Sequence, residues 1–163
     1  MIFILARAVT YAALFIGFLL IFLPGEILQR WGMVRPAAIG LIEVLGLVIG
    51  IAGAALALWC ILTFAVVGRG TPAPFDPPRR LVIAGPYRYV RNPMYIGAAF
   101  ALLGAAVFYR SSALALYSAA FLLVTHFFVL LYEEPALTQT FGDPYQRYRD
   151  KVRRWLPGFP YPL

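Results

Sequence analysis

Long apolar stretches alternate with short polar segments along this chain. The apolar stretches cover residues 2–23, 37–67, 94–109 and 113–132. The first, second and fourth have about 20 residues or more, which is the length that an α-helix needs to cross the hydrocarbon core of a bilayer. The third stretch is shorter, so we expect its helix to tilt or to be shielded by protein. The pattern predicts an all-α integral membrane protein with about four transmembrane helices.

Two polar breaks fix where these helices end. Pro24 and Gly25 stop the first stretch, and Arg110-Ser111-Ser112 is typical of a tight turn between two antiparallel helices. The first stretch, with Arg7 near its start, is also similar to a signal peptide. It is longer than the apolar region of such a peptide and no small-residue cleavage site follows it, so we expect a retained membrane anchor.

Composition supports the same class of protein. Hydrophobic residues make up 62% of the 163 residues and charged residues 13%, unlike an ordinary soluble domain. The mean hydropathy is +0.79. We expect one membrane domain over residues 1–163, with an N-terminal helical hairpin (1–67), a cytoplasmic loop (68–93) and a C-terminal half (94–163). The one cysteine, Cys60, allows neither a disulfide nor a thiolate metal site within the chain, and no metal site is predicted.

Basic residues are divided unevenly between the two predicted sides of the membrane. The side of the termini and the loop holds Arg7, Arg69, Arg79, Arg80, Arg88, Arg91, Arg147, Arg149, Lys151, Arg153 and Arg154. The opposite side holds Arg30, Arg35 and Arg110. Because basic residues concentrate in cytoplasmic segments, both termini are predicted to be cytoplasmic, in an inner or plasma membrane. The net charge of +7 lies at helix ends, which suits lipid headgroups and predicts no nucleic-acid partner.

Three features inside the apolar stretches allow a structural interpretation beside a functional one. Glu43 lies near the start of the second stretch, where a snorkelling or helix-paired acid competes with a functional carboxylate. Gly46 and Gly50 offer a small-residue face for close helix packing, either within the chain or between two chains. His126 has no second ligand at helical spacing, which favours a hydrogen-bonded packing histidine over a metal ligand.

A polar and aromatic segment leads directly into the third apolar stretch. It covers residues 85–97 and reads GPYRYVRNPMYIG. Its tyrosines and arginines fit an interfacial aromatic belt that is anchored to phosphates. Asn92 and Pro93 favour a second interpretation, because they suit the cap and the first residue of a helix. Backbone N–H groups at such a helix start can hold an anionic ligand.

A second polar block follows the fourth apolar stretch. Glu133 and Glu134 stand there as a solvated helix end or as acids that need a cationic or hydroxyl-rich partner. Residues 143–155 then show the pattern of an interfacial amphipathic helix. Its apolar positions are Tyr145, Tyr148, Val152 and Trp155. Either this helix is a membrane anchor alone, or one or two of its cations face inward and bind a lipid carboxylate or phosphate.

The chain resembles the isoprenylcysteine carboxyl methyltransferase and phospholipid methyltransferase superfamily over residues 85–157. The matching blocks are GPYRYVRNPMYIG, a helical hairpin, EEPALTQTFGDPYQRY and VRRWLP. The resemblance implies methyl transfer from S-adenosylmethionine, held by the C-terminal half, to a carboxylate oxygen or an amine of a lipid or lipidated acceptor. The sequence contains no GxGxxG motif, so it does not support a soluble nucleotide-binding fold. Two other functions stay open: a non-catalytic membrane accessory protein, and an NADPH-dependent reductase of a sterol-like lipid.

The resemblance also implies roles for individual residues. The family's Arg-His-Pro-x-Tyr motif falls on residues 91–95, and its acidic motif falls on residues 133–134. The residues expected to bind the methyl donor are Tyr87, Tyr89, Arg91, Asn92, Pro93, Tyr95, Gly97, Glu133, Glu134 and Tyr145. The residues expected to position the substrate are Arg149, Lys151, Arg153 and Arg154. Asn92 replaces a histidine of the isoprenylcysteine enzymes, and Lys151 stands where their tail carries an arginine.

Overall fold

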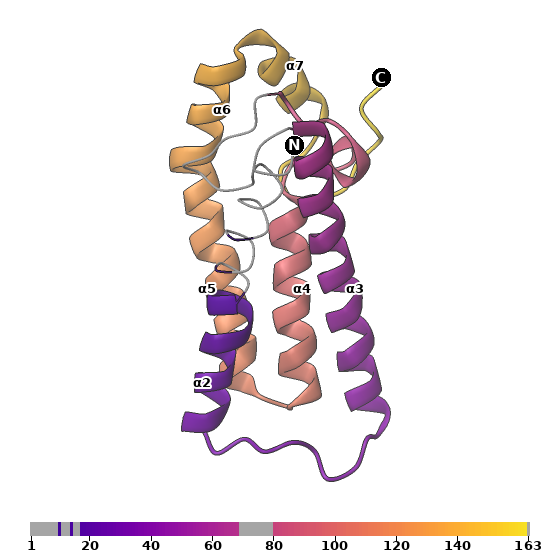
Figure 1. Cartoon of the computed structure of the whole chain (residues 1–163), viewed down its shortest axis with the longest axis vertical. Coiled ribbons are helices and arrows are strands. Elements are labelled where there is room, and N and C mark those ends of the chain that lie inside the picture. Colours follow the sequence, from indigo (N-terminus) through magenta and orange to yellow (C-terminus); the bar gives the residue numbers. More distant parts are fainter. Residues whose placement is uncertain (1–9, 11–13, 15–16, 69–79, 163) are drawn as a thin grey trace.

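The computed structural model describes residues 10, 14, 17–68 and 80–162, and every element in these residues is helical (Figure 1). The longer helices are α2 (Leu23–Arg30), α3 (Leu41–Thr63), α4 (Pro93–Phe108), α5 (Ser112–Phe128), α6 (Glu134–Phe141) and α7 (Asp143–Lys151). π-helical turns at Gly17–Phe22, Phe64–Gly68 and Val129–Glu133 and a 3-10 turn at Gly85–Arg88 complete the fold. The first predicted span lies mostly outside the described residues and stays a prediction.

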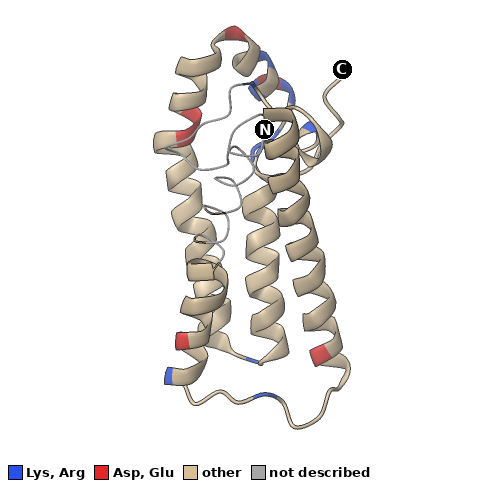
Figure 2. Ribbon diagram, in the orientation of Figure 1, with Lys and Arg blue, Asp and Glu red and all other residues tan. Residues whose placement is uncertain are grey.

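Within the described part of the chain, two helical stretches are long and apolar enough to cross a membrane. They are Leu41–Gly68, with a mean hydropathy of 2.5, and Ser112–Phe141, with 2.2. The helix α4 is apolar but shorter, as its sequence predicts. Charged residues lie at the two ends of the bundle and are missing from the middle of α3, α4 and α5 (Figure 2). Length, composition and charge therefore support a membrane protein. The predicted total of four spans is not confirmed, because two helical stretches in the described residues have sufficient length.

Glycines bring α3 and α4 into close contact. A Cβ on Gly104 would lie 2.3 Å from the backbone nitrogen of Gly50, and a Cβ on Gly46 would lie 2.5 Å from that of Phe108. Farther along, a Cβ on Gly53 would lie 2.5 Å from the nitrogen of Ala101. No side chain fits between the two backbones at these points, which is typical of packing between membrane helices. The small-residue face of α3 is therefore used within the chain.

One end of the bundle, here called the turn end, contains residues 40–43 and the α4–α5 connection. Glu43 is 2% exposed, and its carboxylate accepts hydrogen bonds from Gly40 N (2.8 Å) and Arg110 Nε (2.8 Å). Ser111 caps α5 by accepting a bond from Leu114 N, so the predicted tight turn is confirmed. Glu43 is a helix-paired acid that joins the start of α3 to this turn.

The opposite end, here called the tail end, contains α6, α7 and residues 80–92. The predicted tail helix over residues 143–155 is too long, because α7 ends at Lys151 and Val152 is extended (φ −113°, ψ 126°). The irregular tail instead pairs with the loop before α4. Backbone bonds of 2.9 Å join Arg91 N to Arg153 O, Gly158 N to Tyr89 O and Tyr161 N to Arg88 O. Leaving the helix frees these tail groups to hydrogen-bond with the loop.

The apolar side of α7 faces protein. Tyr145, Tyr148 and Val152 are buried together, and partly buried Leu81, Ile83, Leu137, Phe141 and Tyr161 pack against them. The interpretation of this segment as an interfacial helix with its apolar face in the membrane is therefore wrong for these three residues. The segment closes the tail end because its tyrosines find an apolar partner in the loop and in α6.

Candidate functional site

Three charged residues from distant segments meet at the tail end. Glu134, the first residue of α6, accepts two hydrogen bonds from Arg154 of the tail, from Nε at 2.7 Å and Nη2 at 2.8 Å. Arg91 Nη1 lies 3.0 Å from Glu134 Oε1. Glu134 is 7% exposed, and the Arg91 side chain is 10% exposed. We call this group the Glu134 cluster: one buried carboxylate shared by two guanidinium groups.

Local structure brings the two arginines to the same carboxylate. Pro93 begins α4 and Asn92 is its N-cap residue, as predicted. The Asn92 side chain does not cap the helix but donates from Nδ2 to Arg154 O at 3.2 Å. Together with the backbone bond from Arg91 to Arg153, this contact sets the loop and the tail side by side. Arg91 and Arg154 therefore approach Glu134 from neighbouring backbone positions.

A change in helix type separates the two neighbouring glutamates. The π-helical turn Val129–Glu133 joins α5 to α6, and π-helical turns inside helices often occur at functional sites. Glu133 Oε2 accepts a hydrogen bond from the Tyr95 hydroxyl at 3.1 Å, while Glu134 binds the arginines. The predicted repulsion between the two acids is thus relieved by different partners, a hydroxyl for one and cations for the other.

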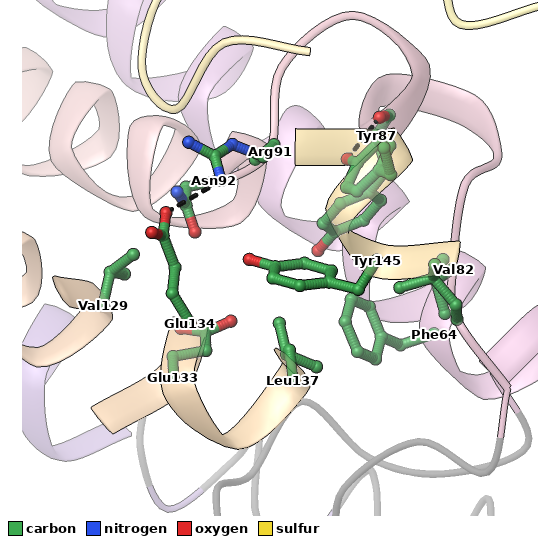
Figure 3. Close-up of a pocket in the computed structure, with 12 residues that line it drawn as sticks. Phe64, Val82, Tyr87, Arg91, Asn92, Val129, Glu133, Glu134, Leu137 and Tyr145 are labelled. Carbon is green, nitrogen blue, oxygen red and sulfur yellow. Dashed lines mark hydrogen bonds and ion pairs between the residues drawn. The ribbon is translucent and has the colours of Figure 1, made fainter. Parts of the chain in front are cut away.

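A pocket adjoins the Glu134 cluster. It is lined by Phe64, Leu81, Val82, Tyr87, Arg91, Asn92, Val129, Glu133, Glu134, Leu137, Tyr145 and Tyr148. Its volume is about 40 Å³, room for a few water molecules. Figure 3 shows Arg91 above the Glu134 carboxylate and the hydroxyl of Tyr145 pointing toward them. The pocket combines charged groups on one side with aromatic and aliphatic walls on the other.

Within the described structure, two nitrogens of the Arg91 guanidinium lack a hydrogen bond, although the group is paired with Glu134. Its Nε and Nη1 atoms are buried and, among the described residues, have no hydrogen-bond partner. Nη1 is close enough to Glu134 for an ion pair but is not aligned for a hydrogen bond. Unsatisfied buried donors are costly, of the order of 1–3 kcal/mol for a polar group. A ligand with an anionic or carbonyl oxygen at this position would remove that cost.

The environment of the pocket keeps its hydroxyls protonated. Burial raises the pKa of Tyr145 and that of Tyr148, so both act as neutral hydroxyl groups near pH 7. The Tyr148 hydroxyl donates to the backbone oxygen of Tyr87 at 2.6 Å and so ties α7 to the loop. The hydrogen bond to Glu134 raises the pKa of Arg154, which keeps this arginine charged. The site therefore holds permanent cations and neutral tyrosines.

Most of the predicted donor-binding residues come together here. Lining the pocket or bonding to its acids are Tyr87, Arg91, Asn92, Tyr95, Glu133, Glu134 and Tyr145, and Pro93 begins the adjoining helix. Tyr89 is 46% exposed and does not line the pocket. Gly97 lies in the α3–α4 contact, where a Cβ would come 2.7 Å from Ala57 N. Its role in this structure is helix packing.

Of the four predicted substrate-positioning residues, Arg154 alone is joined to the Glu134 cluster by a hydrogen bond. Arg149, Lys151 and Arg153 are exposed, although the Lys151 ammonium lies 5.5 Å from the centre of the Tyr161 ring. The sequence interpretation missed Tyr148 as a pocket residue, together with five apolar wall residues, namely Phe64, Leu81, Val82, Val129 and Leu137. The spacing of Tyr145 and Tyr148 by three residues, which places both on one helix face, was the available signal.

Comparison with known proteins gives a family and one relative. A family model described as phospholipid methyltransferase matches residues 41–144, from the start of α3 into the first turn of α7. An uncharacterized protein of Haemophilus influenzae (strain ATCC 51907 / DSM 11121 / KW20 / Rd) is 40% identical over 63 residues, which are 39% of this chain and 100% of that protein. No solved structure matches. The family match contains Arg91 and Glu134 and ends before Arg154.

Proposed function

The chain belongs to the phospholipid methyltransferase family, and from this membership we propose that it transfers a methyl group from S-adenosylmethionine to a membrane lipid or lipidated acceptor. The observation that supports the proposal is buried Arg91, whose Nε and Nη1 make no hydrogen bond among the described residues, in a pocket that also presents two glutamates. The pocket lies where the apolar helices end, so a water-soluble donor and a lipid can both reach this level of the protein.

The chemistry of the pocket fits the proposed donor. S-adenosylmethionine has a carboxylate, which suits Arg91 Nε and Nη1, and cationic amino and sulfonium groups, which suit carboxylates and tyrosine faces. The apolar and aromatic wall residues Phe64, Val82 and Leu137 suit a nucleoside base. Because the pocket volume is about 40 Å³, a ligand of this size requires the walls to move apart. The walls belong to separate segments, namely the π-helical turns Phe64–Gly68 and Val129–Glu133, the loop, α6 and α7.

The side chains of the protein hold the two glutamates of the site in fixed positions. Arg154 fixes the Glu134 carboxylate through two hydrogen bonds, and Tyr95 orients Glu133 through one. Bound S-adenosylmethionine supplies an electrophilic methyl group, which the acceptor takes as the carbon–sulfur bond breaks and the sulfur keeps the bonding electrons. Such a displacement depends mainly on alignment of the reacting atoms, which a rigid, hydrogen-bonded site provides.

The acceptor atom decides whether the protein must also move a proton. A lipid carboxylate attacks as the anion and needs a cation to position it, a role for Arg154 or for the exposed Arg149, Lys151 and Arg153. A lipid amine must lose a proton, which a carboxylate of the pocket can accept. Glu133 suits this task better than Glu134, because its hydrogen bond comes from a neutral hydroxyl and leaves it free of an arginine.

Thermal unfolding of the detergent-solubilised protein tests the donor site. S-adenosylhomocysteine, at concentrations from micromolar to millimolar, should raise the melting temperature saturably, because a ligand that binds the folded state alone stabilises it. NADPH in a parallel series should have no effect. The Arg91→Gln variant should lose the shift, while Glu43→Gln, at the turn end, should keep it. A shift with NADPH alone would favour the lipid reductase, and no shift with either would favour an accessory protein.

A further inference from the structure

A large groove runs along α4 and α5 and is distinct from the pocket at the Glu134 cluster. It is lined by Ile96, Ala99, Phe100 and Leu103 of α4, by Ser118, Ala119, Leu122, Leu123 and His126 of α5, and by Trp155 of the tail. Its volume is about 570 Å³, within the range of small-molecule sites. Apart from its two ends, the lining is entirely hydrocarbon.

Small residues hollow out the groove. Ser118 donates from its hydroxyl to Ala99 O at 3.0 Å, and both residues are buried at the line where the helices touch. Ala119 is the next residue on α5. The side chains of Ala99, Ser118 and Ala119 are all small, and larger ones would fill the groove. Phe100, Leu103 and Leu123 form the higher walls. The groove thus exists because small side chains line it, while α4 and α5 stay in contact through the bond between Ser118 and Ala99.

The dimensions and surroundings of the groove point to one kind of occupant. From Ser118 to His126 the groove follows about 12 Å of α5, at 1.5 Å per residue. One leaflet of the hydrocarbon core is roughly 15 Å thick. The groove lies on helices whose middle carries no charge (Figure 2). A hydrocarbon chain that runs from the tail end toward the bilayer centre matches this length and this chemistry.

The groove has a polar end next to the Glu134 cluster. Trp155 Nε1 donates a hydrogen bond to His126 Nδ1 at 2.9 Å. An indole nitrogen is a donor only, so Nδ1 carries no proton and the ring proton is on Nε2. Among the described residues no partner for Nε2 is found, which leaves this N–H as a donor at the groove end. Trp155 directly follows Arg154, so the groove end adjoins the residue that holds Glu134.

We propose that this groove binds one hydrocarbon chain of the acceptor lipid, and that His126 Nε2–H holds the polar part of that lipid beside the methyl-donor pocket. The proposal rests on the proposed function for the identity of the lipid as acceptor. Trp155 then has a positioning role, because its hydrogen bond fixes the ring orientation and the tautomer of His126. The lipid would enter sideways from the bilayer, and the donor would bind from the tail end.

Photolabelling tests the hydrocarbon part of the proposal. The protein is placed in vesicles of phosphatidylethanolamine that contain a small fraction of the same lipid with a diazirine near the middle of one acyl chain, and labelled residues are identified by mass spectrometry. Groove residues such as Phe100 and Leu123 should be labelled at least fivefold more than Ile51 and Leu58 on the exposed face of α3. Equal labelling of both surfaces would overturn the proposal, because the groove would then be ordinary bilayer contact.

Two neighbouring alanines provide a matched pair of variants. Ala119→Phe fills the groove, whereas Ala120→Phe adds the same side chain to an exposed position of α5 outside it. Groove labelling should fall at least tenfold in the first variant and stay within twofold of the original in the second. An equal loss in both variants, or no loss in either, would contradict the proposal. The S-adenosylhomocysteine shift in each variant shows that it is folded and that the donor site is intact.

Two variants of His126 test the polar part. Asn places an acceptor near the position of Nδ1, so His126→Asn can keep the Trp155 bond but lacks a donor at Nε2. Gln reaches the position of Nε2 with an amide N–H, so His126→Gln can supply that donor. With phosphatidylethanolamine as the trial methyl acceptor, the KM for the lipid should rise about tenfold in the Asn variant and about threefold in the Gln variant, with donor binding unchanged. A KM that is unaffected, or affected equally in both, would overturn the role of His126.

The failure of this proposal is distinguishable from that of the proposed function. Enriched groove labelling that Ala119→Phe removes, in a protein that never responds to S-adenosylhomocysteine, would leave a lipid site without methyl transfer. A normal donor response with unenriched labelling would leave the methyltransferase proposal standing and refute the groove.

Discussion

Glu43 and Glu134 are both buried glutamates that pair with arginine, at opposite ends of the same bundle. Glu43 is 2% exposed and Glu134 is 7% exposed. Glu43 accepts one bond from the backbone of Gly40 and one from Arg110, whose side chain is 62% exposed. Glu134 is held by Arg154 and lies beside Arg91, both largely removed from solvent. The two acids have similar burial and very different surroundings.

The difference lies in how donors and charges are balanced. At the turn end one carboxylate meets one arginine and one helix terminus, and the remaining donors of Arg110 reach solvent. At the tail end one carboxylate meets two arginines, and two buried nitrogens of Arg91 make no hydrogen bond among the described residues. A surplus of buried cationic donors costs free energy unless a ligand uses them. Burial and ion pairing alone therefore do not indicate a ligand-binding site, whereas a buried donor without a hydrogen bond does.

The largest expected effect comes from Glu134→Gln. The change leaves two buried arginines without their counter-charge, and breaking a buried ion pair from one side costs about 3–5 kcal/mol. We expect a clear loss of melting temperature and no response to S-adenosylhomocysteine. Thermal unfolding with and without the ligand measures both. A variant with normal stability and a normal ligand response would show that the cluster is neither structural nor functional.

Arg91→Lys should affect binding more than folding. Lysine retains the positive charge near Glu134 but loses the fork of donors that includes Nε. Since lysine keeps the charge that pairs with Glu134, and Nε and Nη1 make no hydrogen bond among the described residues, the melting temperature without ligand should change little. The affinity for S-adenosylhomocysteine should fall roughly 10- to 100-fold, as for a lost hydrogen bond to a charged group of about 1.5–3 kcal/mol. Isothermal titration checks this, and an unchanged affinity would mean that these donors do not meet the ligand.

Glu43→Gln should show the reverse pattern. The neutral amide oxygen can still accept the bond from Gly40 N, and Arg110 can turn to solvent, so the loss of stability should be about 1 kcal/mol. Binding of S-adenosylhomocysteine should stay unchanged, because the residue lies at the other end of the bundle. Denaturant unfolding together with the ligand titration measures both quantities. Loss of binding here would remove the distinction between the two glutamates.

Tyr95→Phe should have the smallest effect. The variant removes one hydroxyl that donates to Glu133 at 3.1 Å and leaves the ring and the Glu134 cluster in place. The lost bond orients Glu133 and does not itself contact the ligand, so we expect an indirect effect of about 1 kcal/mol, roughly a fivefold loss of donor affinity, if Glu133 contacts the ligand. The same titration checks it. A loss as large as that of Glu134→Gln would place Glu133, rather than Glu134, at the centre of the site.

The sequence by itself determined the helices and their local ends. Apolar runs placed α3, α4 and α5 to within a few residues, and Asn92 and Pro93 marked the start of α4. These features depend on neighbours along the chain, namely hydrophobic periodicity, capping and the fixed φ of proline. The motif at residues 91–95 and the acidic pair belong to the same end of the bundle, where most of the predicted residues meet.

Tertiary structure alone decided what each of these residues touches. Gly97 belongs to the motif region, yet close approach of α3 makes it a packing residue. The amphipathic pattern after Asp143 continued to Trp155, yet the chain leaves the helix at Lys151 because pairing with the loop satisfies its backbone and brings Arg154 to Glu134. Likewise, the bond between His126 and Trp155 joins residues 29 positions apart. Such contacts depend on which surfaces meet when the helices pack, and no local pattern encodes them.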